Sequence, residues 1–204
     1  MSNRGHLIVT AQSGSAPDAG GHEIAEARYA IPVGWLLTTL GETPRSYVSP
    51  DVQPAMEFCY FEMPITTALR RLEGAMSSLK QDEYLWPRFR FVEELKQELS
   101  KYPGHYLQID AEEILCAVGS EGRDQLLKEV PTLLQAFIGQ VETRRRSEAT
   151  ATLNRLEPIS GMRLYGSREK DEQQWAMDLE FLGLSDVDDL CRWWMRGVFV
   201  SDPS

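Results

Sequence analysis

One segment near the middle of the chain most limits the fold, because an extended pattern passes directly into a helical one. Residues 56–61 are rich in aromatic side chains and lie between prolines, which predicts a strand buried on at least one face. Pro64 then begins a helical stripe, in which apolar residues recur at steps of three and four. The residues of that stripe are Ile65, Leu69, Leu72, Met76 and Leu79. A strand and a helix in such close succession favour an α+β fold.

Helical patterns recur along the rest of the chain. Apolar spacing predicts helices over 84–102, over 126–141 with a kink or a new start at Pro131, and over 187–198 with its cap near Ser185. Capping residues predict a shorter helix over 110–118. Mixed patterns indicate short helices over 23–29 and after Pro32. The chain is therefore expected to form four or more helices.

Short extended segments are expected at 7–10, 45–48, 105–109, 162–165 and 175–181. In the last of them, alternation predicts an outer face with Asp178 and Glu180, opposite an inner face of Trp175, Met177, Leu179 and Phe181. Residues 11–22 are rich in glycine and serine, which predicts a flexible loop. With 204 residues, 42% of them hydrophobic, the expectation is a single α+β domain of short antiparallel strands packed against the helices.

The charge of the chain limits the classes of partner. Lys and Arg number 21 against 31 Asp and Glu, which gives a formal net charge of −10. Phosphates repel such a chain, so nucleic acid and membrane surfaces are disfavoured as partners and a basic protein is favoured. The basic cluster at residues 144–146 could contact nucleic acid, but arginines late in a long helix also suit the negative end of its dipole.

No motif indicates a cofactor, a metal or a catalytic group. His6, His22 and His105 do not stand at ligand-like spacing, and the templates for nucleotide, hydrolase and zinc-protease sites are absent from the sequence. The three cysteines, Cys59, Cys116 and Cys191, are expected to be buried free thiols in a reducing compartment. Without an apolar signal core or a stretch of about 20 apolar residues, the expected location is cytoplasmic.

The strongest candidate for a binding surface lies between residues 171 and 191, where seven acids occur without a Lys or Arg. Acidic side chains around exposed aromatic residues would suit a basic partner, because charges steer the encounter and aromatic contacts supply affinity. The candidate residues are Asp178, Glu180, Asp186, Asp188, Asp189 and Trp193. In the alternative interpretation, the aspartates at 186, 188 and 189 simply suit a helix N-terminus.

Two further functions remain open from the sequence. A small enzyme could use Asp110, Glu112 and Glu113 for acid–base chemistry, provided that these carboxylates converge in a cleft. The protein could also be a scaffold that associates with copies of itself as a homo-oligomer. An exposed patch at Trp193 would favour this, because Trp193 does not lie on the inner apolar stripe of its helix.

Short motifs in the first part of the chain carry a resemblance. Asn3-Arg4 leads directly into an apolar strand, and residues 29–32, Tyr-Ala-Ile-Pro, precede Leu40-Gly41 and Pro44. In this respect the chain resembles an uncharacterised family of bacterial proteins that begin with Met-Ala-Asn-Arg, through the helix begun by Pro64. Ser2 in place of Ala and the insert at 11–22 depart from that pattern. The resemblance implies an immunity protein of a polymorphic toxin system, which would bind and neutralise a cognate toxin.

Overall fold

The structure is a computed structural model, and it describes residues 4–14, 17, 20–48, 57–111, 114 and 123–200. Within these residues six strands form one antiparallel sheet in the order β3-β4-β5-β1-β2-β6. The strands are β1 (Arg4–Thr10), β2 (His22–Arg28), β3 (Arg45–Val48), β4 (Glu57–Pro64), β5 (Tyr106–Asp110) and β6 (Val198–Phe199). The predicted α+β fold with short antiparallel strands is confirmed.

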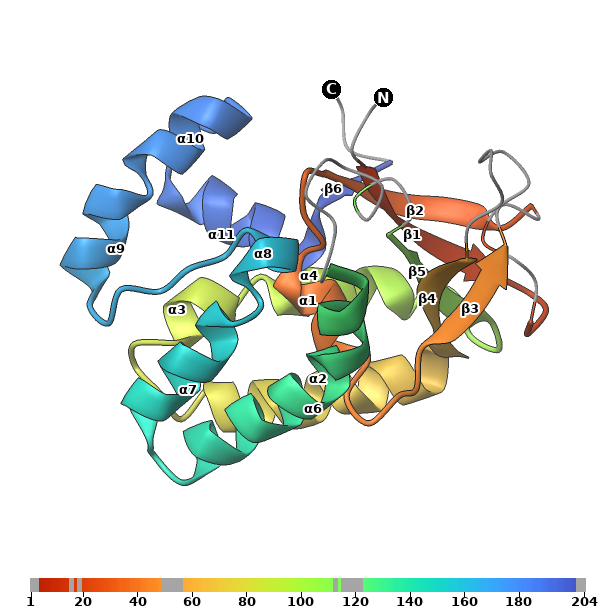
Figure 1. The fold of residues 1–204 in the computed structure, drawn as a ribbon, viewed down its shortest axis with the longest axis horizontal. Coiled ribbons are helices and arrows are strands. Elements are labelled where there is room, and N and C mark those ends of the chain that lie inside the picture. The colour runs from red at the N-terminus through yellow and green to blue at the C-terminus, as the bar shows by residue number, and fades with distance from the viewer. Residues whose placement is uncertain are drawn as a thin grey trace.

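Helices gather beside and below the sheet, and α2 and α6 pack against it next to β4 (Figure 1). In chain order the helices are α1 (Val33–Leu37), α2 (Ile65–Leu79), α3 (Trp86–Phe89), α4 (Val92–Leu99), α6 (Arg123–Glu142), α7 (Arg146–Asn154), α8 (Glu157–Ser160), α9 (Arg168–Gln174), α10 (Ala176–Leu182) and α11 (Val187–Arg196). A single hydrophobic core joins the strands to the helices. Its largest members include three buried tryptophans, Trp35, Trp175 and Trp194.

The two faces of the sheet differ in chemistry because successive side chains of a strand alternate. On the face toward the helices, Leu7 of β1 stands beside Ile109 of β5, and Ile109 stands beside Phe61 of β4. All three side chains are buried. The opposite face carries polar side chains, among them Glu62 beside Gln108. The sheet therefore contributes one apolar wall to the core.

Most of the predicted elements are present, with shifted boundaries. The helix after Pro64, the strands at 45–48 and 56–61, and the C-terminal helix are confirmed as α2, β3, β4 and α11. Helix α6 runs continuously through Pro131, so no new helix begins there. The segment 84–102 forms two helices, α3 and α4, in place of one. The predicted helix over 110–118 lies mostly outside the described residues.

The structure differs from the predicted secondary structure in three segments. Residues 175–181, predicted as a half-buried strand, lie at the α9–α10 junction and in α10. Residues 23–29, predicted as a helix, form β2, because pairing with β1 and β6 outweighs the helical preference of its Glu and Ala residues. Residues 162–165, predicted as a strand, have no regular structure. The backbone N–H of Leu164 donates a hydrogen bond to the side-chain oxygen of Asn154.

Helices α1 and α11 approach so closely that their backbones touch. Gly34 of α1 faces the carbonyl group of Met195, and a Cβ atom at position 34 would lie only 1.9 Å from that oxygen. The indole N–H of Trp35 donates to the carbonyl oxygen of Arg196 at 2.9 Å. This contact fixes the C-terminal helix to the N-terminal part of the chain.

Candidate functional site

Helices α9 and α10 form an arm at the edge of the molecule, next to α11 (Figure 1). The Ser167 hydroxyl caps α9 by accepting from the Lys170 N–H at 3.3 Å. Gly183, with φ of 68°, adopts the left-handed conformation that ends α10. None of the residues of α10 is fully buried. Leu179 and Leu182 pack partly buried against the core, and the rest of α10 is open to its surroundings.

Helix α10 exposes large apolar side chains. Met177 and Phe181 stand four residues apart on α10, and their side chains are 79% and 71% exposed. The ring of Tyr29, which follows β2 and is 53% exposed, lies 5.4 Å from the ring of Phe181. We call these three residues the α10 patch. Clustered exposed apolar side chains mark contact surfaces more often than isolated ones do.

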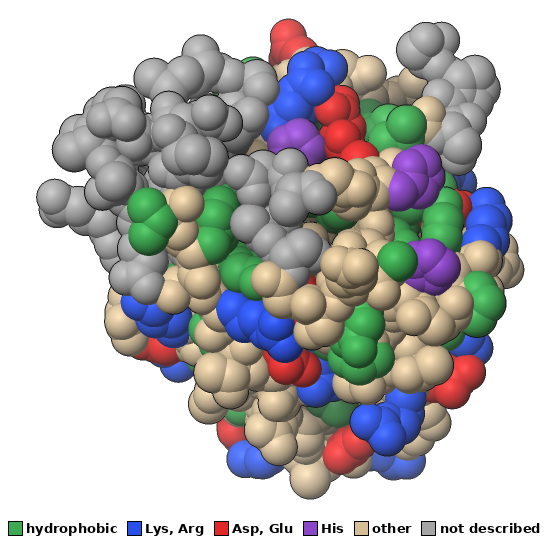
Figure 2. Space-filling model, turned by 90° about the vertical axis from the view of Figure 1, so that its right-hand side faces the viewer, with side chains coloured by type: hydrophobic (Ala, Val, Ile, Leu, Met, Phe, Trp, Pro, Cys, Tyr) green, Lys and Arg blue, Asp and Glu red, His purple; other side chains and the backbone are tan. Residues whose placement is uncertain are grey.

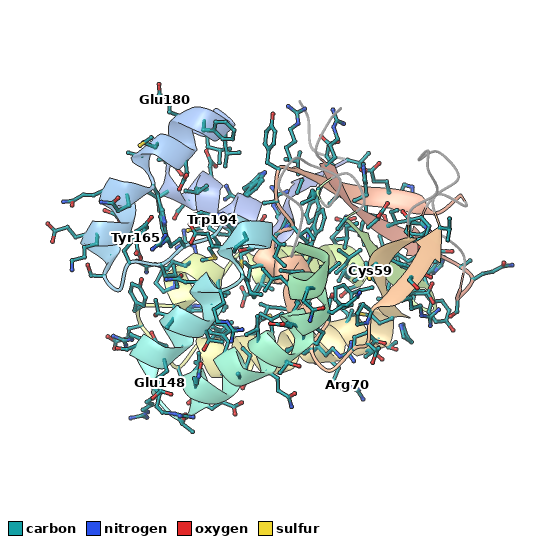
Figure 3. The ribbon with its side chains drawn as sticks, in the orientation of Figure 1. Cys59, Arg70, Glu148, Tyr165, Glu180 and Trp194 are labelled. Carbon is teal, nitrogen blue, oxygen red and sulfur yellow. The ribbon has the colours of Figure 1, made fainter. Side chains whose placement is uncertain are left out.

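Carboxylates border the α10 patch. Asp178 and Glu180 alternate with Met177 and Phe181 along α10, and Figure 3 shows Glu180 pointing away from the body of the molecule. Burial raises the pKa of Asp178 from its ordinary value, and the nearby carboxylate of Glu157 adds to the rise. Asp178 and Glu180, two of the predicted binding residues, thus lie next to the α10 patch.

The other predicted acids lie at the N-terminus of α11, and each has a partner. Asp186 caps this helix and accepts from the Asp189 N–H at 2.9 Å. Asp188 pairs with Arg90, and Asp189 pairs with Arg192 at 2.9 Å. These aspartates match the interpretation in which acids stabilise a helix N-terminus.

Trp193 is 8% exposed and so offers no contact surface. Its burial follows from the position of α11, which packs against α1 as well as against α3 and α4, so that side chains off the main stripe are covered too. The expected exposed patch at Trp193 is therefore not found. Phe181 is an exposed aromatic residue of this region instead, although the predicted strand placed its side chain on the inner face. The spacing of Met177 and Phe181, four residues apart, is the signal that a helical interpretation would have used.

A buried charged cluster lies under the arm, which we call the Asp171 network. Asp171 of α9 accepts from Arg88 Nε at 2.7 Å, from the Tyr84 hydroxyl at 2.8 Å and from the Tyr165 N–H at 2.7 Å. Burial raises the pKa of Tyr84, and the hydrogen bond to Asp171 raises it further. The network holds α9 to α3, so the first of the seven acids is structural.

A second buried carboxylate lies on the outer face of the sheet. Glu62 accepts from the Ser13 hydroxyl at 2.7 Å and from Gln108 Nε2 at 2.8 Å, and it pairs with Arg45 at 2.6 Å. Burial on its own would raise the pKa of Glu62, but these donors and the Gly14 N–H outweigh it and lower the pKa. Because the Glu62 carboxylate accepts from Ser13 and Gly14, it anchors these two residues to the sheet.

The carboxylates proposed for acid–base chemistry are not brought together among the described residues. Asp110 lies on β5, where its Oδ1 is 3.4 Å from the Tyr47 hydroxyl and the residue pairs with His6 across the sheet. Glu112 and Glu113 lie outside the described residues. The convergence of the three carboxylates in a cleft therefore stays a prediction.

The histidines share one face of the molecule, as Figure 2 shows. His6 Nδ1 is 2.9 Å from a Glu23 carboxylate oxygen, and the rings of His22 and His105 both lie next to Tyr102. Within the part of the chain that the structure describes, no group of three or more His, Cys, Asp or Glu side chains could hold a metal ion.

The arginines at 144–146 lie at the turn between α6 and α7. Arg145 pairs with Glu148 at 2.9 Å, and Arg146 pairs with Asp82 at 3.0 Å. Two of the three charges are thus compensated locally, which suits a solvated turn.

Cys59 and Cys191 are buried free thiols, as expected, whereas Cys116 lies outside the described residues. Burial raises the pKa of the Cys191 thiol to about 12. A raised pKa means that the folded state holds its proton more tightly than the unfolded state. Stability from this group is complete below pH 9 and falls between pH 9 and pH 12.

We therefore predict that the free energy of unfolding falls as pH rises above 9, and that Cys191→Ala makes this fall shallower. The slope from one such group is about 1.4 kcal/mol per pH unit. Urea unfolding of both proteins from pH 8.5 to 10 measures it. The unaltered protein is the reference, and an equal slope for it and for Cys191→Ala would count against the assignment.

The described residues include no helix with the length and apolar character needed to cross a membrane. No protein-family model matches the chain, and neither a curated protein nor a solved structure matches it.

Proposed function

We propose that this protein binds a basic partner protein through the α10 patch. The observation that carries the proposal is the exposure of Met177 and Phe181 on α10, with the exposed ring of Tyr29 against Phe181. Asp178 and Glu180 lie next to them on the same helix. Exposed apolar side chains gain free energy when a partner removes them from water. The bordering carboxylates favour a partner of opposite charge and reject an acidic one.

The charge of the whole chain supports a basic partner. A net charge of −10 creates a negative field that speeds the encounter with a positively charged protein. Such association is sensitive to ionic strength, because salt screens charges over about 8 Å at physiological concentration. The negative charge of the chain would then speed the encounter with the same partner that the apolar α10 patch binds.

The most concrete form of the proposal is an immunity protein that covers the active face of a cognate bacterial toxin. The resemblance of the N-terminal segment supports this form, and a toxin that acts on an anionic substrate would be basic. Mixing the purified protein with the product of the neighbouring gene should give one complex on size exclusion. Independent elution of the two proteins would remove the toxin as the partner.

The patch residues should dominate the affinity for the partner. We expect Met177→Ser with Phe181→Ser to weaken binding by about a hundredfold, which corresponds to about 3 kcal/mol for two truncated contact residues. Isothermal titration with the purified partner measures this. Val48→Ser is the matched control, because Val48 is an exposed apolar residue on β3. Equal affinity of the patch variant and the control would contradict the proposed surface.

A further inference from the structure

A cavity of about 160 Å³ lies between α3, α9 and α11, on the inner side of the arm. Its walls combine three kinds of side chain. Arg88, Arg90 and Arg168 supply three guanidinium groups, and Trp175 and Val187 supply apolar surface. Glu172 and Asp188 add two carboxylates at the same wall. Each of these arginines pairs with a carboxylate of the protein, so a ligand has to compete with those acids.

Arg88 is the fixed group of this cavity. The residue is 4% exposed, and its guanidinium stacks 4.0 Å above the Tyr84 ring. It donates from Nε and Nη2 to Asp171 and from Nη1 to the Tyr84 carbonyl oxygen. An arginine has five N–H groups, so these contacts between described residues leave two further donors in a buried position. A buried cationic group with spare donors is suited to an oxyanion.

Arg90 and Arg168 are adjustable groups at the mouth. Arg90 pairs with Asp188, and Arg168 pairs with Glu172 at 2.6 Å. The side chains of both pairs are exposed, and exposed ion pairs contribute about 0–1 kcal/mol. Either arginine can therefore turn to an incoming anion at little cost.

We propose that this cavity binds a small organic carboxylate. The carboxylate would accept from Arg88, Arg90 and Arg168 together, and the apolar part of the ligand would lie against Trp175 and Val187. A cavity of about 150 Å³ holds a benzene ring, so the present volume suits a ligand of that order of size. This inference does not depend on the proposed partner protein.

Such a ligand would also influence the arm. Arg168 and Trp175 belong to α9 and its junction with α10, whereas Arg88 and Val187 belong to α3 and α11. A molecule held between them connects the arm to the body of the protein. Binding at the cavity should therefore raise the stability of the folded protein by mass action.

The test uses the full chain and benzoate as the probe, in buffer of constant ionic strength. We expect saturable binding with one site in isothermal titration. Arg168→Gln and Arg90→Gln, both at exposed side chains, should each weaken binding by about tenfold, because each removes a charge-assisted hydrogen bond. Arg145→Gln is the matched control, since Arg145 also forms an exposed pair with an acid, and it should leave binding unchanged.

The possible outcomes separate the proposal from general ionic effects. Benzoate binding that both cavity variants weaken and the control does not would support it, and weaker binding of neutral benzyl alcohol would support the role of the carboxylate. Absence of saturable binding, or an equal loss in Arg145→Gln, would overturn it. Inorganic phosphate that binds as tightly as benzoate and displaces it would overturn the assignment of an organic ligand.

Discussion

Replacing Asp171 with asparagine should lower the free energy of unfolding by about 3–5 kcal/mol, the usual cost of removing one partner from a buried ion pair. The Arg88 guanidinium would stay buried without its counter-charge. Asparagine could still accept one hydrogen bond, but the charge that holds Arg88 would be lost. Urea unfolding followed by circular dichroism measures the change.

The neighbouring residue Glu172 provides the matched control. It lies on the same helix and pairs with Arg168, but both side chains are exposed. Glu172→Gln should therefore change the free energy of unfolding by less than about 1 kcal/mol. If Asp171→Asn were as stable as this control, the Asp171 network would not be holding α9 to α3.

Gly34→Ala should destabilise the protein by about 3 kcal/mol or more, because overpacking against rigid backbone forces the structure to shift. The new Cβ atom would lie 1.9 Å from the carbonyl oxygen of Met195, which a side-chain movement cannot relieve. Helices α1 and α11 would have to separate. Thermal and urea unfolding measure the loss.

Gly74→Ala is the control for this substitution. Gly74 is an exposed residue of α2, and a Cβ atom there would meet nothing within 4 Å. Because alanine is the better helix former, Gly74→Ala should stabilise the protein by about 0.5–1 kcal/mol. Opposite signs for the two substitutions are expected. A neutral Gly34→Ala would show that the contact between α1 and α11 is looser than described.

The sequence predicts well those elements whose pattern comes from their own burial. The stripe of α2 and that of α11 repeat at helical spacing because one side of each helix faces the core, and the aromatic run of β4 reflects its position within the sheet. These elements could be assigned without knowledge of their neighbours. The overall fold class follows from them.

The errors occur where neighbours decide the structure. Strand β2 forms because β1 and β6 pair with it, and nothing in residues 22–28 announces those partners. Helix α10 alternates apolar and acidic residues by composition, which imitates a half-buried strand. Leu179 and Leu182, three residues apart, pack partly buried against the core, and one such pair is too short a pattern to mark the core-facing side of a helix.

The sequence predicts the candidate site only in part, for the same reason. The acidic segment 171–191 contains Asp178 and Glu180, which border the α10 patch, but it also contains Asp171, whose partner Arg88 lies 83 residues earlier. A count of charges treats both kinds of acid alike. The exposed position of Phe181 and the burial of Trp193 depend on how α11 packs, which spacing along one helix does not show.

The most direct test of the account is photo-cross-linking from α10 in the native cells. A photoreactive amino acid at position 177 should yield one main adduct with a basic protein. When the reaction is repeated in a lysate of these cells, a higher salt concentration should reduce the yield of this adduct. The same group at position 148, an exposed residue on α7, should not give that adduct. Identical adducts from both positions, an adduct with a second copy of this chain, or none at all would contradict the proposed binding surface.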